Sequence, residues 1–260
     1  MTAVLDDIMR AARRRAERLE LPQMPASPRR AVRDFRAALA ASRPAFIAEI
    51  KRASPSRGIL RDPVDVAEIA RAYREGGAAA ISILTEPDFF RGSNEDFARV
   101  AAAVDLPLLR KDFIVSEAQL RESALLGASA VLLIAAVLSP AELRDLRRVA
   151  EEELRLAALV EVHTPEEMAV AVSAGATLIG VNNRDLRTFR VSLDTCEQLA
   201  RLSPPGVMLV AESGIRSAGD VHRLQAAGIH AFLVGESLMV AADPASKLRA
   251  LRGRGDACSA

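Results

Sequence analysis

Lysine is nearly absent from this chain. Of its 35 lysines and arginines only three are lysines, Lys51, Lys111 and Lys247, so arginine supplies the general surface charge. Lys51 and Lys111 each end an apolar run typical of a buried strand, where a solvated charge fits poorly. A partly buried lysine can lose its proton at an attainable pH, which an arginine cannot. The pattern favours acid–base chemistry at both positions over lysines that simply extend from a strand end into water.

Cysteine and long apolar runs are also scarce. The two cysteines, Cys196 and Cys258, stand in no metal-like spacing, so neither a disulfide framework nor a metal site is indicated. No apolar run reaches the roughly 18 residues of a membrane span. The N-terminus carries Asp6 and Asp7 and lacks the apolar core of a secretory signal. We therefore expect a cytoplasmic protein with no membrane association.

A charge excess of either sign is missing as well. The formal net charge is +1, which gives no surplus for binding a polyanion. The one basic cluster, at 13–15, lies among Asp6, Glu17 and Glu20 on a segment with helical character. Nucleic acid is therefore not an expected partner.

Short apolar runs rich in β-branched residues recur along the chain, with helical segments between them. Eight such runs predict strands at 46–51, 79–84, 107–111, 130–134, 157–161, 178–182, 207–212 and 231–234. The segments predicted to be helical include 64–76, 117–127, 140–153, 165–175 and 220–228, and most end at glycine. Eight βα units with strands too apolar to leave a face in water predict an α/β fold, a closed (β/α)8 TIM barrel.

A doubly wound open sheet is the alternative architecture. It fits less well, because no Gly-x-Gly-x-x-Gly motif follows the first strand and polar residues follow nearly every strand. We expect residues 1–260 to form a single barrel domain, with 1–45 as a helical extension that caps the barrel or covers its mouth. This extension has two arginine-rich helical segments, separated by the proline-containing stretch 21–28.

Charged and polar residues gather at the predicted strand ends. In a barrel these ends surround the active site, so the residues form one constellation: Glu49, Lys51, Lys111, Glu161, Asn182, Glu212, Ser213, Gly214, Gly235 and Glu236. Glu49 and Lys51 are two apart on a strand and point to the same side. A structural layer of ion pairs is the alternative. However, each buried charge costs several kcal/mol unless it is paired, so the set exceeds what packing needs.

The last two predicted βα turns carry a second signal. Ser213-Gly214-Ile215 follows the seventh strand and Gly235-Glu236-Ser237 follows the eighth. Barrels often bind phosphate in these two loops, through backbone N–H groups and a short helix. Either glycine alone fits ordinary turn geometry. Together, in these two loops, they favour a phosphate ester as the substrate.

Several of these stretches resemble indole-3-glycerol phosphate synthase of tryptophan biosynthesis. They are residues 47–58 (IAEIKRASPSRG), 109–113 (LRKDF), 159–163 (LVEVH), 179–186 (IGVNNRDL) and 211–215 (AESGI). The resemblance runs in order from about residue 46 to residue 238, and the N-terminal extension is similar to that family's extra helices.

The resemblance implies a reaction without cofactor or metal. In it, 1-(2-carboxyphenylamino)-1-deoxyribulose 5-phosphate closes its indole ring and loses carbon dioxide and water. By match to the family, Lys111 is the general acid for ring closure and Glu161 serves the dehydration, with Glu49 and Lys51 in support. Lys51 is also placed to pair with the substrate carboxylate. Asn182 and Ser213 are expected to orient the substrate's amino and hydroxyl groups.

Substrate-binding roles follow from the same resemblance. We expect Arg184 and Glu212 to pair across the mouth. Four residues are expected around the phosphate, with the carboxylate of the last turned away from it: Ser54, Gly214, Gly235 and Glu236. Three apolar residues follow strands and either sandwich the anthranilate ring or belong to the core: Pro55, Phe89 and Phe113.

Other polar residues are given no catalytic role. The three histidines, His163, His222 and His230, have no partner at catalytic spacing, and Glu86 is expected to hold its loop. The expected partner is a small phosphorylated molecule. The protein is expected to be a monomer that can associate with other tryptophan-pathway enzymes.

Two rival functions remain open at this point. A phosphosugar isomerase such as phosphoribosylanthranilate isomerase shares the phosphate loops, but its cysteine and aspartate pair is missing from these strand ends, since Cys196 lies in a helical stretch. A non-catalytic sensor of phosphate ligands would not need two lysines and two carboxylates at the mouth.

Overall fold

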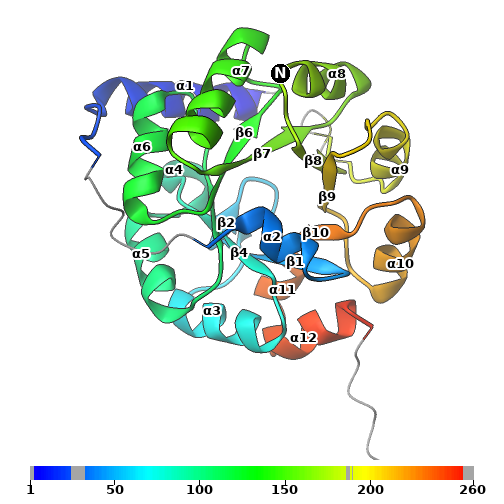
Figure 1. The fold of residues 1–260 in the computed structure, drawn as a ribbon. Coiled ribbons are helices and arrows are strands. Elements are labelled where there is room, and N and C mark those ends of the chain that lie inside the picture. The colour runs from blue at the N-terminus through cyan, green and yellow to red at the C-terminus, as the bar shows by residue number, and fades with distance from the viewer. Residues whose placement is uncertain (1–2, 25–32, 186–187, 189, 254–260) are drawn as a thin grey trace, which may run out of the picture.

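The computed structural model describes residues 3–24, 33–185, 188 and 190–253 (Figure 1). Its centre is a closed barrel of eight parallel strands in the order β1-β10-β9-β8-β7-β6-β5-β4. The strands are β1 (Ala45–Ile50), β4 (Ala80–Leu84), β5 (Leu108–Lys111), β6 (Ala130–Ile134), β7 (Ala157–Val162), β8 (Leu178–Asn182), β9 (Met208–Glu212) and β10 (Ala231–Val234). The predicted (β/α)8 TIM barrel is confirmed, and each predicted strand end lies within one residue of the observed one.

The strands are apolar because both of their faces are covered. All six residues of β1 and all five of β4, β6 and β8 are buried. One face packs on the outer helices and the other fills the barrel, as expected for a parallel sheet. In register, Glu49 of β1 pairs with Ser82 of β4, and Glu161 of β7 pairs with Gly180 of β8. Polar residues at the strand ends therefore meet at one end of the barrel.

Helices surround the barrel in Figure 1. They are α3 (Val66–Glu75), α4 (Pro87–Phe90), α5 (Asn94–Ala103), α6 (Glu117–Leu126), α7 (Pro140–Arg148), α8 (Pro165–Ser173), α9 (Asp194–Ala200), α10 (Ala218–Ala226), α11 (Glu236–Met239) and α12 (Pro244–Leu251). Many begin at a side-chain cap that accepts a backbone N–H, as Ser116, Ser139 and Ser217 do. The predicted helix 140–153 changes at Val149 to a π-helical turn that ends at Glu153. A two-stranded hairpin, β2 (Ala53–Ser54) with β3 (Gly58–Ile59), follows β1 and was not predicted.

Two helices precede the barrel. Phe35 and Leu39 of α2 (Phe35–Ala40) are buried against Ala45 and Ile47 of β1, in the cluster that fills the barrel interior. In Figure 1, α2 lies in front of the barrel strands. The longer α1 (Ala3–Arg18) contacts α4, which follows the C-terminal end of β4. The two helices therefore lie at opposite ends of the barrel.

Part of the predicted extension falls outside the described residues, namely 25–32, and so does Cys258. Cys196 is buried in α9, the helical stretch in which it was expected. Across the ranges that the structure describes, no helix combines the length and the apolar character needed to span a membrane.

Phe35 closes the barrel interior, so its removal should be costly. Phe35 is 1% exposed, and Phe35→Ala leaves a cavity that the surrounding strands cannot fill. We expect a loss of about 3–5 kcal/mol in the free energy of unfolding, measured by urea denaturation. Leu202→Ala is the control, because Leu202 is 53% exposed and its truncation should cost far less. Equal losses in the two variants would show that α2 does not seal the barrel.

Candidate active site

A pocket of about 750 Å³ opens at the C-terminal ends of the strands. It is the position at which barrel enzymes carry their active sites. Fourteen of the fifteen residues proposed from the sequence line this pocket: Glu49, Lys51, Ser54, Pro55, Lys111, Phe113, Glu161, Asn182, Arg184, Glu212, Ser213, Gly214, Gly235 and Glu236.

Phe89 is the proposed residue that does not line the pocket. Its neighbour Phe90 lines it instead, with its ring centroid 6.1 Å from that of Phe113. Phe89 and Phe90 both belong to the short helix α4, and successive residues of a helix point in different directions. Glu86 caps this helix by accepting the backbone N–H groups of Asp88, Phe89 and Phe90, so the expectation that Glu86 holds its loop is confirmed.

The Lys111 ammonium lies at the centre of a cluster of buried carboxylates. Its Nζ is 3.4 Å from Glu212 Oε2, 3.5 Å from Glu161 Oε2 and 4.0 Å from Glu49 Oε2. The Lys51 ammonium is 2.8 Å from Glu49 Oε1. Three carboxylates thus share two ammonium groups. In the described part of the chain, no three histidine, cysteine or acidic side chains are arranged to hold a metal ion.

Two glycines make room for these carboxylates. A Cβ atom at Gly180 would lie 2.1 Å from Glu212 Oε1, and one at Gly235 would lie 2.4 Å from Glu49 Oε1. Both positions face the barrel interior at the depth where the carboxylates lie. Any side chain there would displace a buried carboxyl group, so each glycine is required by packing.

The neighbours of Glu49 and Glu161 keep these groups ionised. Burial favours the neutral carboxyl, but Lys51 and Lys111 outweigh it and lower the pKa of Glu49 below its ordinary value. Burial likewise opposes the charge on Glu161, but Lys111, His163 and the amide of Asn182 lower its pKa. Burial works against the ammonium of Lys111 too, yet Glu212, Glu161 and Glu49 together raise the pKa of Lys111.

Glu212 behaves differently from the other two carboxyls. Burial is the largest influence, the attraction of Lys111 offsets only part of it, and the charges of Glu161 and Glu49 add to it. Together they raise the pKa of Glu212 to about 8. Its Oε1 is buried and has no hydrogen-bond partner. One cluster therefore holds two ionised carboxylates and one carboxyl that keeps its proton at neutral pH.

The two loops proposed for phosphate lie beside this cluster. After β9, Ser213 and Gly214 both have positive φ, 63° and 83°. A Cβ at Gly214 would approach Val191 Cγ1 to 2.6 Å, so the turn needs glycine for both conformation and space. After β10, Gly235 precedes α11, and the Ser237 hydroxyl donates to the Ile215 carbonyl at 3.4 Å.

The predicted pair between Arg184 and Glu212 is wrong. Arg184 lies at the rim, where its guanidinium is 3.7 Å from a carboxylate oxygen of Glu236. Glu236 also lies 3.4 Å from Arg57 Nε. Glu212 points into the barrel toward Lys111 instead. The pairing differs because Glu212 belongs to the buried end of a strand, whereas Arg184 follows β8 and bridges to Val191.

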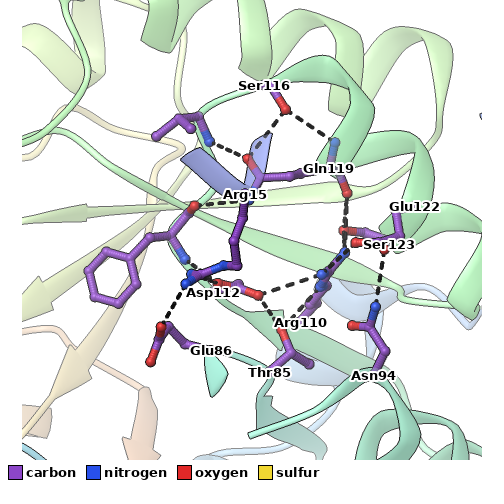
Figure 2. A network of polar contacts seen from close by, with 12 residues as sticks. Arg15, Thr85, Glu86, Asn94, Arg110, Asp112, Ser116, Gln119, Glu122 and Ser123 are labelled. Atoms are coloured by element: carbon purple, nitrogen blue, oxygen red, sulfur yellow. Dashed lines mark hydrogen bonds and ion pairs between the residues drawn. The ribbon is translucent and has the colours of Figure 1, made fainter. Parts of the chain in front are cut away.

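Behind Lys111, its neighbour Arg110 is buried in a polar network among the outer helices (Figure 2). Arg110 lies 2.7 Å from Glu122 and 3.5 Å from Asp112, and its Nε donates to the Thr85 hydroxyl. Thr85 in turn donates to Asp112 at 2.6 Å. Arg110 and Lys111 face opposite sides of β5, so this network fixes the strand from which the Lys111 ammonium projects.

Arg15 of α1 joins the same network (Figure 2). Its guanidinium lies 3.0 Å from Glu86, 2.6 Å from Asp88 and 3.8 Å from Asp112. Earlier residues of α1 line the pocket, namely Val4, Leu5 and Ile8. The sequence pointed to a helical extension near the mouth but not to this contact, because long-range ion pairs leave no periodic signal.

His163 is a further residue that the sequence analysis left without a role. Its Nε2 is 3.4 Å from Glu161 Oε1, and its Nδ1 is 3.2 Å from Glu167 Oε2. The expectation that it lacks a partner is wrong. The spacing of Glu161 and His163, two apart at a strand end, is the signal that could have indicated it.

Comparisons with known proteins agree with this geometry. The sequence model of the family described as indole-3-glycerol phosphate synthase matches residues 4–251. The indole-3-glycerol phosphate synthase of Albidiferax ferrireducens is 46% identical over 262 residues, which cover 96% of this chain and 98% of that protein. The enzyme of the same name from Carboxydothermus hydrogenoformans is 51% identical over 206 residues, 79% of this chain and 78% of that protein.

Among solved structures, a thiamine phosphate pyrophosphorylase from Pyrococcus furiosus has a similar fold. Its TM-score is 0.60 at 19% sequence identity, and the match covers 81% of this chain and 94% of that one. At this identity the likeness concerns the barrel alone.

The raised pKa of Glu212 predicts a stability change with pH. Its folded-state pKa is about 8 against an ordinary value of 4.5, so between these pH values the native state binds more protons than the unfolded chain. This group therefore lowers the free energy of unfolding as the pH rises through that window. Glu212→Gln removes the effect. The melting temperature of the variant minus that of wild type should therefore increase from pH 5 to pH 9.

Thermal melts at several pH values measure this difference. Glu75→Gln is the matched control, since Glu75 is exposed on α3 and the gap to wild type should stay constant. A gap for Glu212→Gln that is flat or shrinks with rising pH would show that Glu212 is ionised throughout.

Proposed function

The chain belongs to the indole-3-glycerol phosphate synthase family, and we propose how the residues of its pocket divide that family's reaction between them. The protein is a lyase of tryptophan biosynthesis. It converts 1-(2-carboxyphenylamino)-1-deoxyribulose 5-phosphate to indole-3-glycerol phosphate by ring closure, decarboxylation and dehydration. The observation that carries the proposed roles is the Lys111 ammonium, held by three carboxylates at the base of the pocket.

Lys111 is the general acid for ring closure. The aromatic carbon that bears the carboxylate attacks the ketone carbon, and the carbonyl π electrons move to the oxygen. An ammonium beside that oxygen stabilises the charge and donates the proton that makes a hydroxyl. The raised pKa of Lys111 supports this role, because it keeps the group protonated until the alkoxide forms. Loss of carbon dioxide then returns an electron pair to the ring and restores its aromaticity.

Glu161 is the base for the dehydration that follows. An acid protonates the hydroxyl so that it leaves as water. A base removes a proton from the adjacent carbon of the new ring. The lowered pKa of Glu161 supports its role as the base. Asn182 donates to Glu161 Oε1 at 3.1 Å and fixes its direction, and Asn182 and Ser213 orient the substrate. Glu49 and Lys51 support these steps, with Lys51 also paired to the substrate carboxylate.

The rest of the pocket binds the two ends of the substrate. Ser54 and the loops at Gly214 and Gly235 hold the phosphate, and Glu236 contributes its backbone N–H. The contacts of the Glu236 carboxylate with Arg57 and Arg184 support a side chain turned away from the phosphate. At the other end, Pro55 and Phe113 pack on the anthranilate ring, together with Phe90.

The wider setting is also a proposal. Residues 1–260 act as one barrel domain with its helical extension, and the reaction needs no metal or cofactor. The protein is a cytoplasmic monomer that can associate with other enzymes of the tryptophan pathway. Nucleic acid and membranes are not partners.

An isomerase with a cysteine acid–base group fits this pocket less well. Cys196 is fully buried in α9, and its thiol donates to the Val181 carbonyl. Burial raises the pKa of Cys196 to about 12, so this thiol does not supply the proton transfers of such a reaction.

The direct test is an assay with the purified protein, the carboxyphenylamino substrate and a chelator. Indole absorbance should appear together with one carbon dioxide for each product molecule. Release of an isomer without carbon dioxide, or binding without turnover, would overturn the proposed function.

Lys111→Arg tests the general acid. The substitution keeps the positive charge but loses the transferable proton and the compact shape of the ammonium. We expect kcat to fall by a factor on the order of 100 or more. Lys247→Arg is the matched comparison: Lys247 also lines the pocket but is no neighbour of the buried carboxylates, and its hydrogen bond to the Arg216 carbonyl is one that an arginine can also make. Activity of Lys111→Arg within about threefold of wild type would remove Lys111 from this role.

Glu161→Gln tests the order of the steps. Glutamine keeps the shape and the hydrogen bond to Asn182 but is not a base, so substrate should still bind and cyclise. In a single turnover, carbon dioxide release should then run ahead of indole formation. Glu166→Gln is the control, since Glu166 is exposed on α8. If both signals slowed together, Glu161 would act at or before ring closure. If neither changed, it would be a structural partner of Lys111.

A further inference from the structure

His163 lies between two carboxylates, and no step described above uses it. One ring nitrogen, Nε2, is 3.4 Å from Glu161 Oε1 at the pocket, and the other, Nδ1, is 3.2 Å from Glu167 Oε2 on α8. The side chain is 9% exposed, so the ring is largely withdrawn from water. The imidazole therefore links the proposed base to a carboxylate outside the barrel.

The local sequence explains this position. Glu161 lies on β7 and His163 follows that strand, so the two side chains leave the backbone on the same side. Thr164 then caps α8, which places Glu167 in the first turn. The Glu167 carboxylate accepts the backbone N–H of His163 at 2.6 Å as well as facing its ring. Glu167 thus fixes both the backbone and the ring of His163.

The contacts of the ring favour its protonated form. Nε2 is buried and forms no hydrogen bond. In a neutral ring with its hydrogen on Nδ1, Nε2 would place a lone pair 3.4 Å from the carboxylate oxygen of Glu161, which is repulsive. An imidazolium hydrogen-bonds Glu167 through Nδ1 and places a positive charge 3.4 Å from Glu161 Oε1. Burial alone opposes the charge, but Glu167, Glu161 and Glu212 offset it, so the pKa of His163 is raised above its ordinary value.

We propose that His163 is a positioning residue that, as an imidazolium, orients the Glu161 carboxylate and keeps it ionised. The proposal rests on the proposed role of Glu161 as the base. The ring acts on Oε1, the oxygen that also accepts from Asn182 of β8, whereas Lys111 of β5 faces Oε2. Burial is the largest influence on Glu161 and opposes its ionisation, and the His163 cation offsets part of that opposition, as Lys111 does. The other carboxyls that face the cluster are Glu49 on β1 and Glu212 on β9.

His163 keeps a positive charge beside Glu161 throughout the reaction, which Lys111 cannot do. The Lys111 ammonium is shared by three carboxylates, and it gives up its proton when the ketone closes. Its attraction for Glu161 therefore weakens just before Glu161 must act as a base. The imidazolium takes no part in that proton transfer. It keeps a positive charge beside Glu161 after Lys111 has become neutral.

The first test is the pH dependence of indole formation after carbon dioxide release, in single turnovers of the full-length enzyme. His163→Gln keeps a polar side chain but has no charge, so the pKa of Glu161 should rise. We expect the acidic limb of the profile to move up by about one pH unit. The rate of indole formation in His163→Gln should be about tenfold below that of wild type on that limb. The two rates should converge at higher pH. His222→Gln is the matched control, since His222 is exposed on α10.

The second test observes the ring directly. The chain has three histidines, so the ring signals can be assigned by NMR with His222→Gln and His230→Gln variants. His163 should titrate above the ordinary value of about 6.5. Glu161→Gln should lower its pKa, because the coupling between the two groups is reciprocal. This measurement needs no substitution at His163, so it holds even where His163→Gln does not fold.

The outcomes separate this proposal from the proposed function. Failure of the wild-type protein to form indole would overturn the proposed function. The NMR titration would then still decide whether His163 and Glu161 are coupled. An active wild type with an unshifted acidic limb in His163→Gln would overturn the positioning role. So would a His163 pKa that does not respond to Glu161→Gln.

Discussion

The ammonium of Lys111 sets the arrangement of the whole pocket. Three carboxylates from three strands converge on it within 4.0 Å, and all three are buried. Without a cation at this point they would repel one another and draw in water, since an unpaired buried charge costs several kcal/mol. Arginine would supply the charge but not the proton. The proposed chemistry and the packing of this end of the barrel thus both require a lysine at position 111.

The surrounding elements can be understood as support for this ammonium. The buried network of Arg110, Thr85 and Asp112 holds the outer face of β5, and Arg15 ties α1 to the same aspartate. Gly180 and Gly235 leave space inside the barrel for the carboxylates of Glu212 and Glu49. At the opposite end of the barrel, α2 fills the interior with Phe35. The apolar end thus gives stability and the polar end gives function, as in other barrels.

The fold and most of the pocket could be predicted from the sequence, because both depend on local patterns. Apolar runs between helical segments gave the strands, and their ends gave the charged cluster. The errors concern side-chain direction. Phe90 lines the pocket in place of Phe89 because α4 turns the chain, and Arg184 meets Glu236 because Glu212 faces inward. The ion pairs of Arg15 and the contacts of His163 depend on the tertiary structure, which spacing alone does not reveal.

The different states of the three carboxyls follow from how the other cations are placed. All three share Lys111, but Glu49 has Lys51 at 2.8 Å and Glu161 has His163 at 3.4 Å. Among the described residues, Glu212 has no second cation within ion-pair distance, and it is the carboxyl whose pKa is raised. A third ionised carboxylate would have only Lys111, which Glu49 and Glu161 already share, so it would add repulsion without a cation of its own. The site therefore holds a proton on Glu212 because the second cations, Lys51 and His163, belong to Glu49 and Glu161, and the cluster keeps one neutral carboxyl beside two ionised ones at neutral pH.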